Sequence, residues 1–207
     1  MRKVLAFNLV SLDGFFEGPD HNIDWHNVDD EFNDFAVQQL ADLGMLIFGR
    51  VTYELMASYW PTPTAIETDP HVSSQMNALP KVVFSRTLQT ADWTNTRLVN
   101  TDAAAEVAAL KQQPGKDIAL FGSAKLQSGL LQAGQIDELR VMLNPVILGR
   151  GTPLFKPEDQ LKLTLLDLKR FRSGNVLLTY VPCQTHRPPG SSTPPSATPT
   201  ASPTLER

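Results

Sequence analysis

The chain has 207 residues, enough for one domain of ordinary size and too few for two large ones. Apolar residues make up 42% and charged residues 19%, so a sizeable core can be buried and wholesale disorder is excluded. The 18 Lys and Arg against 22 Asp and Glu give a net charge of −4, which leaves no overall cationic field to attract a nucleic acid.

The first predicted element is a strand over Val4 to Val10, a short apolar run that only Asn8 interrupts. The run resembles a signal peptide superficially, but Asp13 and Glu17 follow where a small-residue cleavage site should be. No stretch approaches the ~20 apolar residues of a membrane-spanning helix. We therefore expect no membrane partner.

Short apolar runs and helical patterns then alternate along the chain. A glycine-punctuated loop is expected over 11–27, and a second mostly irregular stretch over 62–80, with one short helix entered through Asp69-Pro70. The expected helices cover 29–43, ended by Gly44, then 50–59, 102–112 and 124–132; the expected strands cover 45–48, 81–85, 97–99 and 117–121.

The C-terminal part changes character, because 136–143, 161–171 and 176–182 read as strands with no helix between them. The turn Ser173-Gly174-Asn175 makes the last two a hairpin. An alternating half followed by strands alone predicts an α/β fold with a central mixed sheet. That sheet is parallel in its N-terminal part and antiparallel at its C-terminal edge, with helices on both faces.

A composition shift separates 1–183, the expected folded domain, from 184–207. The latter holds six of the 16 prolines and nine Ser or Thr, so a disordered tail is expected whose deletion leaves stability unchanged. The only cysteine, Cys183, excludes an internal disulfide and a Cys-rich zinc site. A reducing, cytoplasmic location is the natural expectation.

Three strand ends carry residues suited to an anion: Gly49-Arg50-Val51-Thr52, Ser85-Arg86, and Gly122-Ser123-Ala124. Carboxyl ends of parallel strands share one edge, where free helix N–H groups can meet a phosphate. Glycine lets the backbone approach, and hydroxyl and guanidinium groups add hydrogen bonds. Any one junction is more often simple turn geometry. No G-x-G-x-x-G or P-loop opens a helix, which disfavours a doubly wound dehydrogenase or an NTPase.

The loop after the first strand is the second signal. Gly14 and Gly18 could flex, and Phe15 and Phe16 could form a lid over a flat ring; the alternative is a surface loop with both rings tucked into the core. His21, Asp24 and His26 match no metal-ligand spacing, so we expect a solvated loop and no metal.

Taken in order, these motifs resemble the dihydrofolate-reductase-like family. The resemblance rests on Ser11-Leu12-Asp13-Gly14, Gly49 to Glu54, Leu79 to Leu88, Phe121 to Leu126 and Asn144 to Phe155. Within that family the last two stretches are similar to the reductase domain of the bifunctional riboflavin-biosynthesis deaminase-reductase, in a stand-alone form.

The resemblance implies NADPH as hydride donor and a pterin-like or ribosylamino-pyrimidine substrate. It implies that Gly49, Arg50 and Thr52 lie near the cofactor phosphates and that Ser85 and Arg86 lie near the 2′-phosphate. It further implies roles for Gly122, Ser123, Ala124 and Leu126 at the pyrophosphate, for Gly151 at the nicotinamide, and for Asp13, Gly14, Phe15 and Phe16 beside nicotinamide and substrate. Asp13 is the candidate catalytic residue; its alternative role is to cap the turn at Gly14.

The sequence also departs from its relatives. The Cys-containing zinc motif of the deaminase half is absent, and Tyr53 to Trp60 does not match the Asn/Asp-Pro substrate segment of the ribityl-pyrimidine reductases. Asp29, Asp30 and Asp34 are candidates for the pterin-facing carboxylate of true dihydrofolate reductases, without a matching motif. A true dihydrofolate reductase and a non-catalytic nucleotide-binding module remain alternatives. Uncovered C-terminal strands, which pair in relatives, predict a homodimer.

Overall fold

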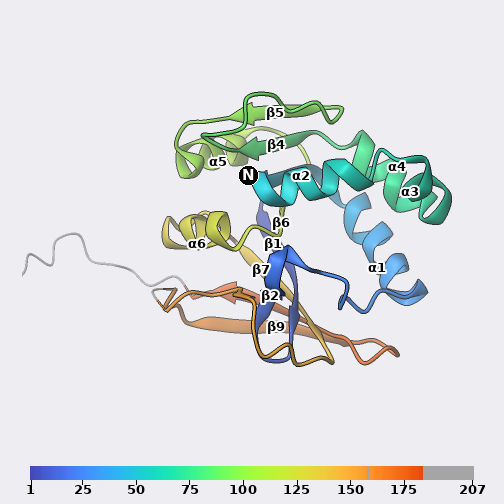
Figure 1. Cartoon of the computed structure of the whole chain (residues 1–207). Helices are drawn as coiled ribbons and strands as arrows, with labels where there is room; N and C mark the ends of the chain where they lie inside the picture. The colour runs from blue at the N-terminus through green and yellow to red at the C-terminus, as the bar shows by residue number, and fades with distance from the viewer. Residues whose placement is uncertain (158, 184–207) are drawn as a thin grey trace, which may run out of the picture.

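An eight-stranded sheet runs through the middle of the molecule in the order β5-β4-β3-β6-β1-β7-β10-β9 (Figure 1). The computed structural model describes residues 1–157 and 159–183, so the expected tail over 184–207 lies outside the described residues. The strands are β1 Val4–Ser11, β3 Leu43–Gly49, β4 Lys81–Phe84, β5 Thr96–Val99, β6 Asp117–Phe121, β7 Glu138–Asn144, β9 Leu163–Arg170 and β10 Val176–Pro182.

The strand directions confirm the predicted mixed sheet. β1 pairs in parallel with both β6 and β7, and β3 pairs in parallel with β4 and β6. β10 runs antiparallel to β7 and to β9, which forms the C-terminal edge. The antiparallel pair follows from a short connection, because a hairpin turn joins β9 to β10, whereas parallel neighbours need a longer crossover.

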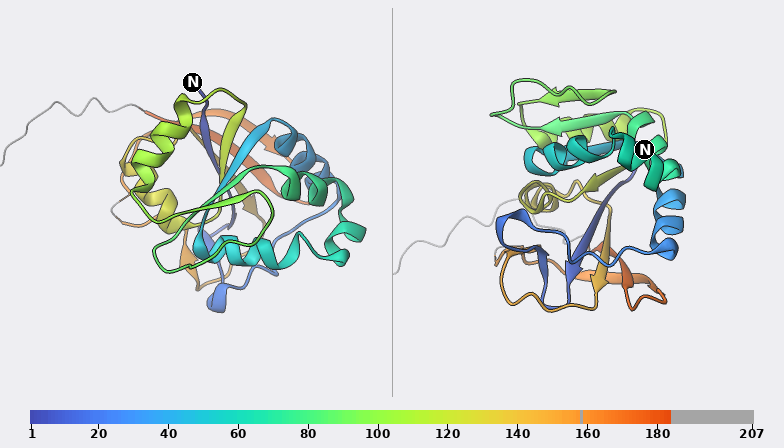
Figure 2. Two further views of the ribbon diagram at one scale, coloured as in Figure 1. Left: turned by 90° about the horizontal axis from the view of Figure 1, so that it is seen from above. Right: turned by 45° about the vertical axis from the view of Figure 1, so that its right-hand side comes forward.

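Helices cover both faces of the sheet, as Figure 2 shows from two further sides. One face packs against α1 Asp30–Ala41, α2 Arg50–Tyr59 and α4 Pro70–Ala78; the other packs against α5 Ala103–Gln112 and α6 Ala124–Gln132. β1 does not alternate between apolar and polar residues, because both of its faces are buried. Leu5 and Phe7 belong to the core on the side of α1, α2 and α4, and Val4 and Ala6 belong to the core on the side of α5 and α6. No helix in the described ranges has the length and apolarity to cross a membrane.

Most element bounds lie within two residues of those expected, but the end of the first helix and the stretch over 62–80 differ in kind. The first helix ends at Ala41, and Gly44 lies inside β3 instead of ending the helix. Glycine is favoured there because a Cβ would lie only 3.0 Å from the backbone oxygen of Lys116. The stretch over 62–80 is mostly helical, since α3 Pro63–Thr68 precedes α4 and the Thr62 side chain accepts from the Ala65 amide.

A small second sheet joins the expected loop over 11–27 to a segment for which the sequence analysis predicts no element. β2 Phe15–Glu17 pairs antiparallel with β8 Thr152–Pro153. Strands of three and two residues are too short to show a periodic pattern, and their partners lie more than 130 positions apart. The loop after β1 is therefore fastened to the segment that contains Gly151.

A group of asparagines anchors the segment before α1. The Asn27 amide donates to Asn144 Oδ1 at 2.8 Å, and its side chain donates to the Ser173 carbonyl at 2.9 Å. Asn175 Nδ2 donates in return to the Asn27 carbonyl at 2.7 Å. The adjacent His26 is partly buried, and this burial lowers its pKa to about 4, so the expectation of a fully solvated loop is wrong at this residue.

Candidate functional site

The three predicted junctions lie on one edge of the sheet. β1, β3, β4 and β6 are parallel, so their carboxyl ends point the same way. Gly49 at the end of β3 is in register with Phe84 at the end of β4, immediately before Ser85. β6 lies on the other side of β3 and leads into Gly122. The chain thus brings together segments as far apart as Gly49 and Gly122, as the parallel-strand argument predicts.

Two glycines at this edge allow unusually close contacts. A Cβ on Gly49 would lie 2.1 Å from Ser123 Oγ and 3.0 Å from Ser123 Cβ. A Cβ on Gly122 would lie 3.0 Å from both Thr52 Oγ1 and Thr52 Cγ2. The junctions after β3 and β6 therefore interlock through Gly49, Thr52, Gly122 and Ser123, which we call the cradle. Glycine at positions 49 and 122 leaves room for the Ser123 and Thr52 side chains to pack directly on the backbone.

Two helices begin at the cradle without a side-chain cap. The N-cap residue of α2 is Gly49, which has no side chain to accept a hydrogen bond, and the side chain of Ser123, the N-cap of α6, accepts none from its helix. By contrast, Asp29 and Asp102 cap α1 and α5 with side-chain oxygens. Free N–H groups and the positive ends of two helix dipoles therefore meet at one place, an arrangement that favours a diphosphate.

Cationic and hydroxyl groups flank this edge. Arg50 forms an exposed ion pair with Glu54 at 2.8 Å, and Arg86 is exposed. Ser85 Oγ accepts from the amides of Thr87 and Leu88 at 3.1 and 2.9 Å, which fixes the turn that presents Arg86. Ala124 and Leu126 lie in the first turns of α6; Leu126 Cβ lies 3.9 Å from the position of a Gly49 Cβ.

The proposed lid lies against the cradle. Phe16 Cε2 would be 3.3 Å from a Cβ on Gly122, and the Phe16 ring is half-buried against Val10, Ala124 and Leu154. Gly151 contacts the same segment, since a Cβ there would lie 2.2 Å from the Glu17 carbonyl oxygen. The structure thus brings Phe16 and Gly151 to the edge where the sequence placed them.

Asp13 is exposed at the end of β1 and fastens a neighbouring loop. Its carboxylate accepts from the amides of Leu148 and Gly149 at 3.1 and 2.7 Å. A hydrogen bond from Ser11, together with these amides, lowers the pKa of the Asp13 carboxyl. The group is therefore ionised at neutral pH and suits orientation of a donor better than delivery of a proton.

The polar residues of the loop form other contacts. His21 Nδ1 lies 2.9 Å from Glu17 Oε1, and Asp24 accepts from Asn22 at 2.8 Å. In the part of the chain that the structure describes, no three His, Cys, Asp or Glu side chains are grouped to hold a metal ion. The sequence reasoning missed a buried contact between Asn8 and Gln127, which the one polar residue in the first strand could have signalled.

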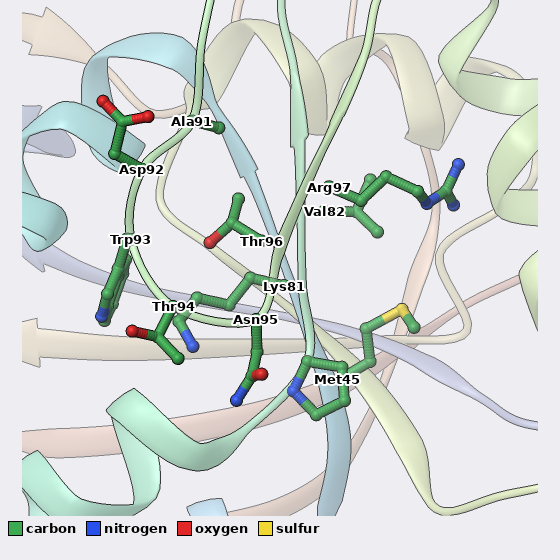
Figure 3. Close-up of a pocket in the computed structure, with 11 residues that line it drawn as sticks. Met45, Lys81, Val82, Ala91, Asp92, Trp93, Thr94, Asn95, Thr96 and Arg97 are labelled. Atoms are coloured by element: carbon green, nitrogen blue, oxygen red, sulfur yellow. The ribbon is translucent and has the colours of Figure 1, made fainter.

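A separate pocket of about 480 Å³ lies at the amino ends of β4 and β5 (Figure 3). It contains none of the residues discussed above. Burial lowers the pKa of Lys81 in its wall to about 8, but Lys81 Nζ donates to the carbonyls of Asn77 and Leu79 and lies 4.5 Å from the Trp93 ring centre. These contacts fasten the end of α4, so Lys81 has a structural role.

The family model of the RibD C-terminal domain matches residues 2–177. An uncharacterized protein of Bacillus subtilis (strain 168), YyaP, is 33% identical over 86% of this chain and 94% of its own length. A putative riboflavin biosynthesis protein from Shewanella sp. PV-4 has a similar structure, with a TM-score of 0.68, 22% identity and coverage of 88% and 99%. A dihydrofolate reductase from Enterococcus faecalis complexed with NADP(H) shares the fold at a TM-score of 0.60, with 14% identity and coverage of 87% and 96%.

Proposed function

The chain belongs to the RibD C-terminal domain family, and from this premise we propose that it is an NADPH-dependent reductase. The substrate is a pterin-like or ribosylamino-pyrimidine compound with an electrophilic C=N or C=O carbon. The convergence of α2 and α6 at the cradle supports this function most strongly, because two uncapped helix N-termini beside glycines suit the cofactor's pyrophosphate. The residues present therefore fit the cofactor.

Each part of the site has a distinct task in this proposal. The α2 and α6 amides with Thr52, Ser123 and Ala124 would hold the phosphates, while Ser85 and Arg86 would bind the 2′-phosphate. Bound NADPH supplies the hydride. The Phe16 segment and Gly151 would exclude water from the nicotinamide end, and Asp13 would orient the substrate through its fixed carboxylate.

NADPH should bind about ten- to a hundredfold more tightly than NADH. Arg86 is exposed beside the Ser85 turn, and charge-assisted hydrogen bonds to a 2′-phosphate contribute ~1.5–3 kcal/mol. Titrations that follow tryptophan fluorescence with each cofactor measure the ratio. Arg86→Ala should remove most of this preference, whereas Arg97→Ala, whose side chain pairs with Glu106, should keep it. Equal dissociation constants in the wild-type chain would contradict the assignment.

A homodimer through β9 is part of the same proposal. β9 is the outer strand of the sheet, and Leu165, Leu166 and Leu168 are 48%, 57% and 51% exposed. An edge strand with exposed leucines is an association surface, although Lys169 and Arg170 partly oppose it. A second copy of the chain across a two-fold axis would cover this strand in both protomers.

Light scattering coupled to gel filtration should therefore give a mass of twice 22.8 kDa. Leu166→Lys should shift the protein to monomer at tens of micromolar, because a charge on the interface strand is costly to bury. Ile66→Lys, at a residue of α3 that is 51% exposed, should leave the dimer intact. A monomeric wild-type mass would exclude the dimer.

A further inference from the structure

Two buried amide side chains contact each other beside the cradle. Asn8 of β1 is 2% exposed and Gln127 of α6 is 0% exposed, and Asn8 Nδ2 donates to Gln127 Oε1 at 2.5 Å. Among the described residues, Asn8 Oδ1 and Gln127 Nε2 have no hydrogen-bond partner. A buried polar group without a partner costs ~1–3 kcal/mol, so this pair is expensive as a purely structural element.

The pair lies where two central strands separate. The parallel register between β1 and β6 runs to Phe7 opposite Phe121, and the Gly122 amide donates to the Phe7 carbonyl. Asn8 is the next residue of β1, and Gln127 follows one turn after Ala124 at the start of α6. The unpartnered atoms therefore lie next to the last β1–β6 pair, near the carboxyl edge that holds the cradle, which is the edge where open α/β sheets bind ligands.

The two free atoms define a specific ligand chemistry. One is a carbonyl acceptor and the other an amide donor. If the oxygen and nitrogen atoms of both amides are assigned the other way round, the pair still leaves one free acceptor and one free donor. A primary carboxamide on a flat ring offers the complementary donor and acceptor in one group.

The Phe16 ring packs on a buried cluster that neighbours this pair. Val141 is in register with Asn8, and it forms a buried cluster with Val10, Ala124 and Leu154 against which Phe16 packs. β2 is a three-residue strand that follows Gly14, a residue with φ of +86°. The aromatic ring at this point thus belongs to a weakly paired segment that can yield its position to another ring.

We propose that Asn8 and Gln127 recognise the carboxamide of the nicotinamide ring, which takes the position of the Phe16 ring when the cofactor binds. This inference rests on the proposed NADPH function and adds two specificity-determining residues to it. The acceptor on Asn8 takes the carboxamide N–H, and the donor on Gln127 reaches its carbonyl.

Calorimetric titration of the full chain separates this inference from the function on which it rests. The ligands are NADPH, its 3-acetylpyridine analogue, which keeps the carbonyl but lacks the amide N–H, and 2′-phospho-ADP-ribose, which lacks the ring. The double variant N8L/Q127M replaces both amides with apolar groups of similar size, a change that is often neutral for folding. Its melting curve serves as the control for folding.

The wild-type chain should bind the acetyl analogue at least fivefold more weakly than NADPH, a result that needs no variant. The double variant should lose about tenfold in NADPH affinity and keep its affinity for 2′-phospho-ADP-ribose. The inference would be overturned if the wild-type chain bound NADPH and its acetyl analogue equally well. It would also be overturned if the double variant kept its affinity for NADPH, or lost as much affinity for 2′-phospho-ADP-ribose as for NADPH. No binding of any ligand to the wild-type chain would instead reject the NADPH function, and the inference with it.

Discussion

Gly151→Ala should destabilise the protein by about 2–4 kcal/mol and lower its melting temperature by about 5–15 °C. Gly151 has φ of +151°, which an L side chain rarely adopts, and a Cβ would lie 2.2 Å from the Glu17 carbonyl oxygen. The obstructing atom belongs to the backbone of β2, so a side-chain rotation cannot relieve the clash. The β2–β8 pair must open instead, and the Phe16 segment loses its support.

Two other glycines provide matched controls for the same thermal unfolding experiment. Gly149 has φ of +71° with nothing within 4 Å of its Cβ position, so Gly149→Ala measures backbone strain without a clash, at ~1 kcal/mol. Gly129 lies inside α6 in open space, and Gly129→Ala should raise stability by up to about 1 kcal/mol. If Gly151→Ala lowers the free energy of unfolding no more than Gly149→Ala does, then the clash with the Glu17 carbonyl contributes nothing to the effect.

The second large effect is an acid-induced loss of stability through His26. Burial lowers its pKa from 6.5 to about 4, and its Nε2 atom has no hydrogen-bond partner among the described residues. The unfolded chain therefore binds a proton before the folded chain does. The contribution of neutral His26 to the free energy of unfolding is complete above pH 6.5. Up to about 3 kcal/mol of it is lost as the pH falls toward 4.

Urea unfolding at a series of pH values measures this contribution. His26→Phe keeps an aromatic ring and cannot titrate. Between pH 7 and pH 4, the variant should therefore lose about 3 kcal/mol less of its free energy of unfolding than the wild-type protein does. Carboxyl groups that titrate in both proteins cancel in this difference. His71→Gln, at an exposed position of α4, should retain the wild-type pH profile. Parallel profiles for wild type and His26→Phe would contradict the buried, neutral state.

Local signals explain which elements the sequence predicts well. The bounds of α2 and α6 agree with the expected 50–59 and 124–132, because Gly49 and Gly122-Ser123 precede them and Pro61 follows α2 closely. β6 is likewise recovered as Asp117–Phe121 between Gly115 and Gly122. In each case the residues that start or stop the element adjoin it in the chain.

Contacts between distant segments explain what the sequence could not predict. Gly44 suits a helix end, yet its role depends on the backbone of Lys116, and the segment that holds the partly buried His26 is anchored through Asn27 by Asn144 and Asn175. The shared edge of the three junctions was predictable from parallel strand order alone. The direct contact of Gly49 with Ser123 depends on how α2 and α6 pack, which no local pattern encodes.

Hydrogen exchange followed by mass spectrometry, on the full chain with and without NADPH, tests the central claim most directly, since it shows where the cofactor binds. NADPH should slow exchange in peptides that cover 49–53 and 122–127, where the uncapped amides of α2 and α6 lie, and 85–88, the turn that presents Arg86. No change is expected over 91–97, in the wall of the pocket in Figure 3. Protection confined to 91–97, or no protection at saturating NADPH, would contradict the central claim.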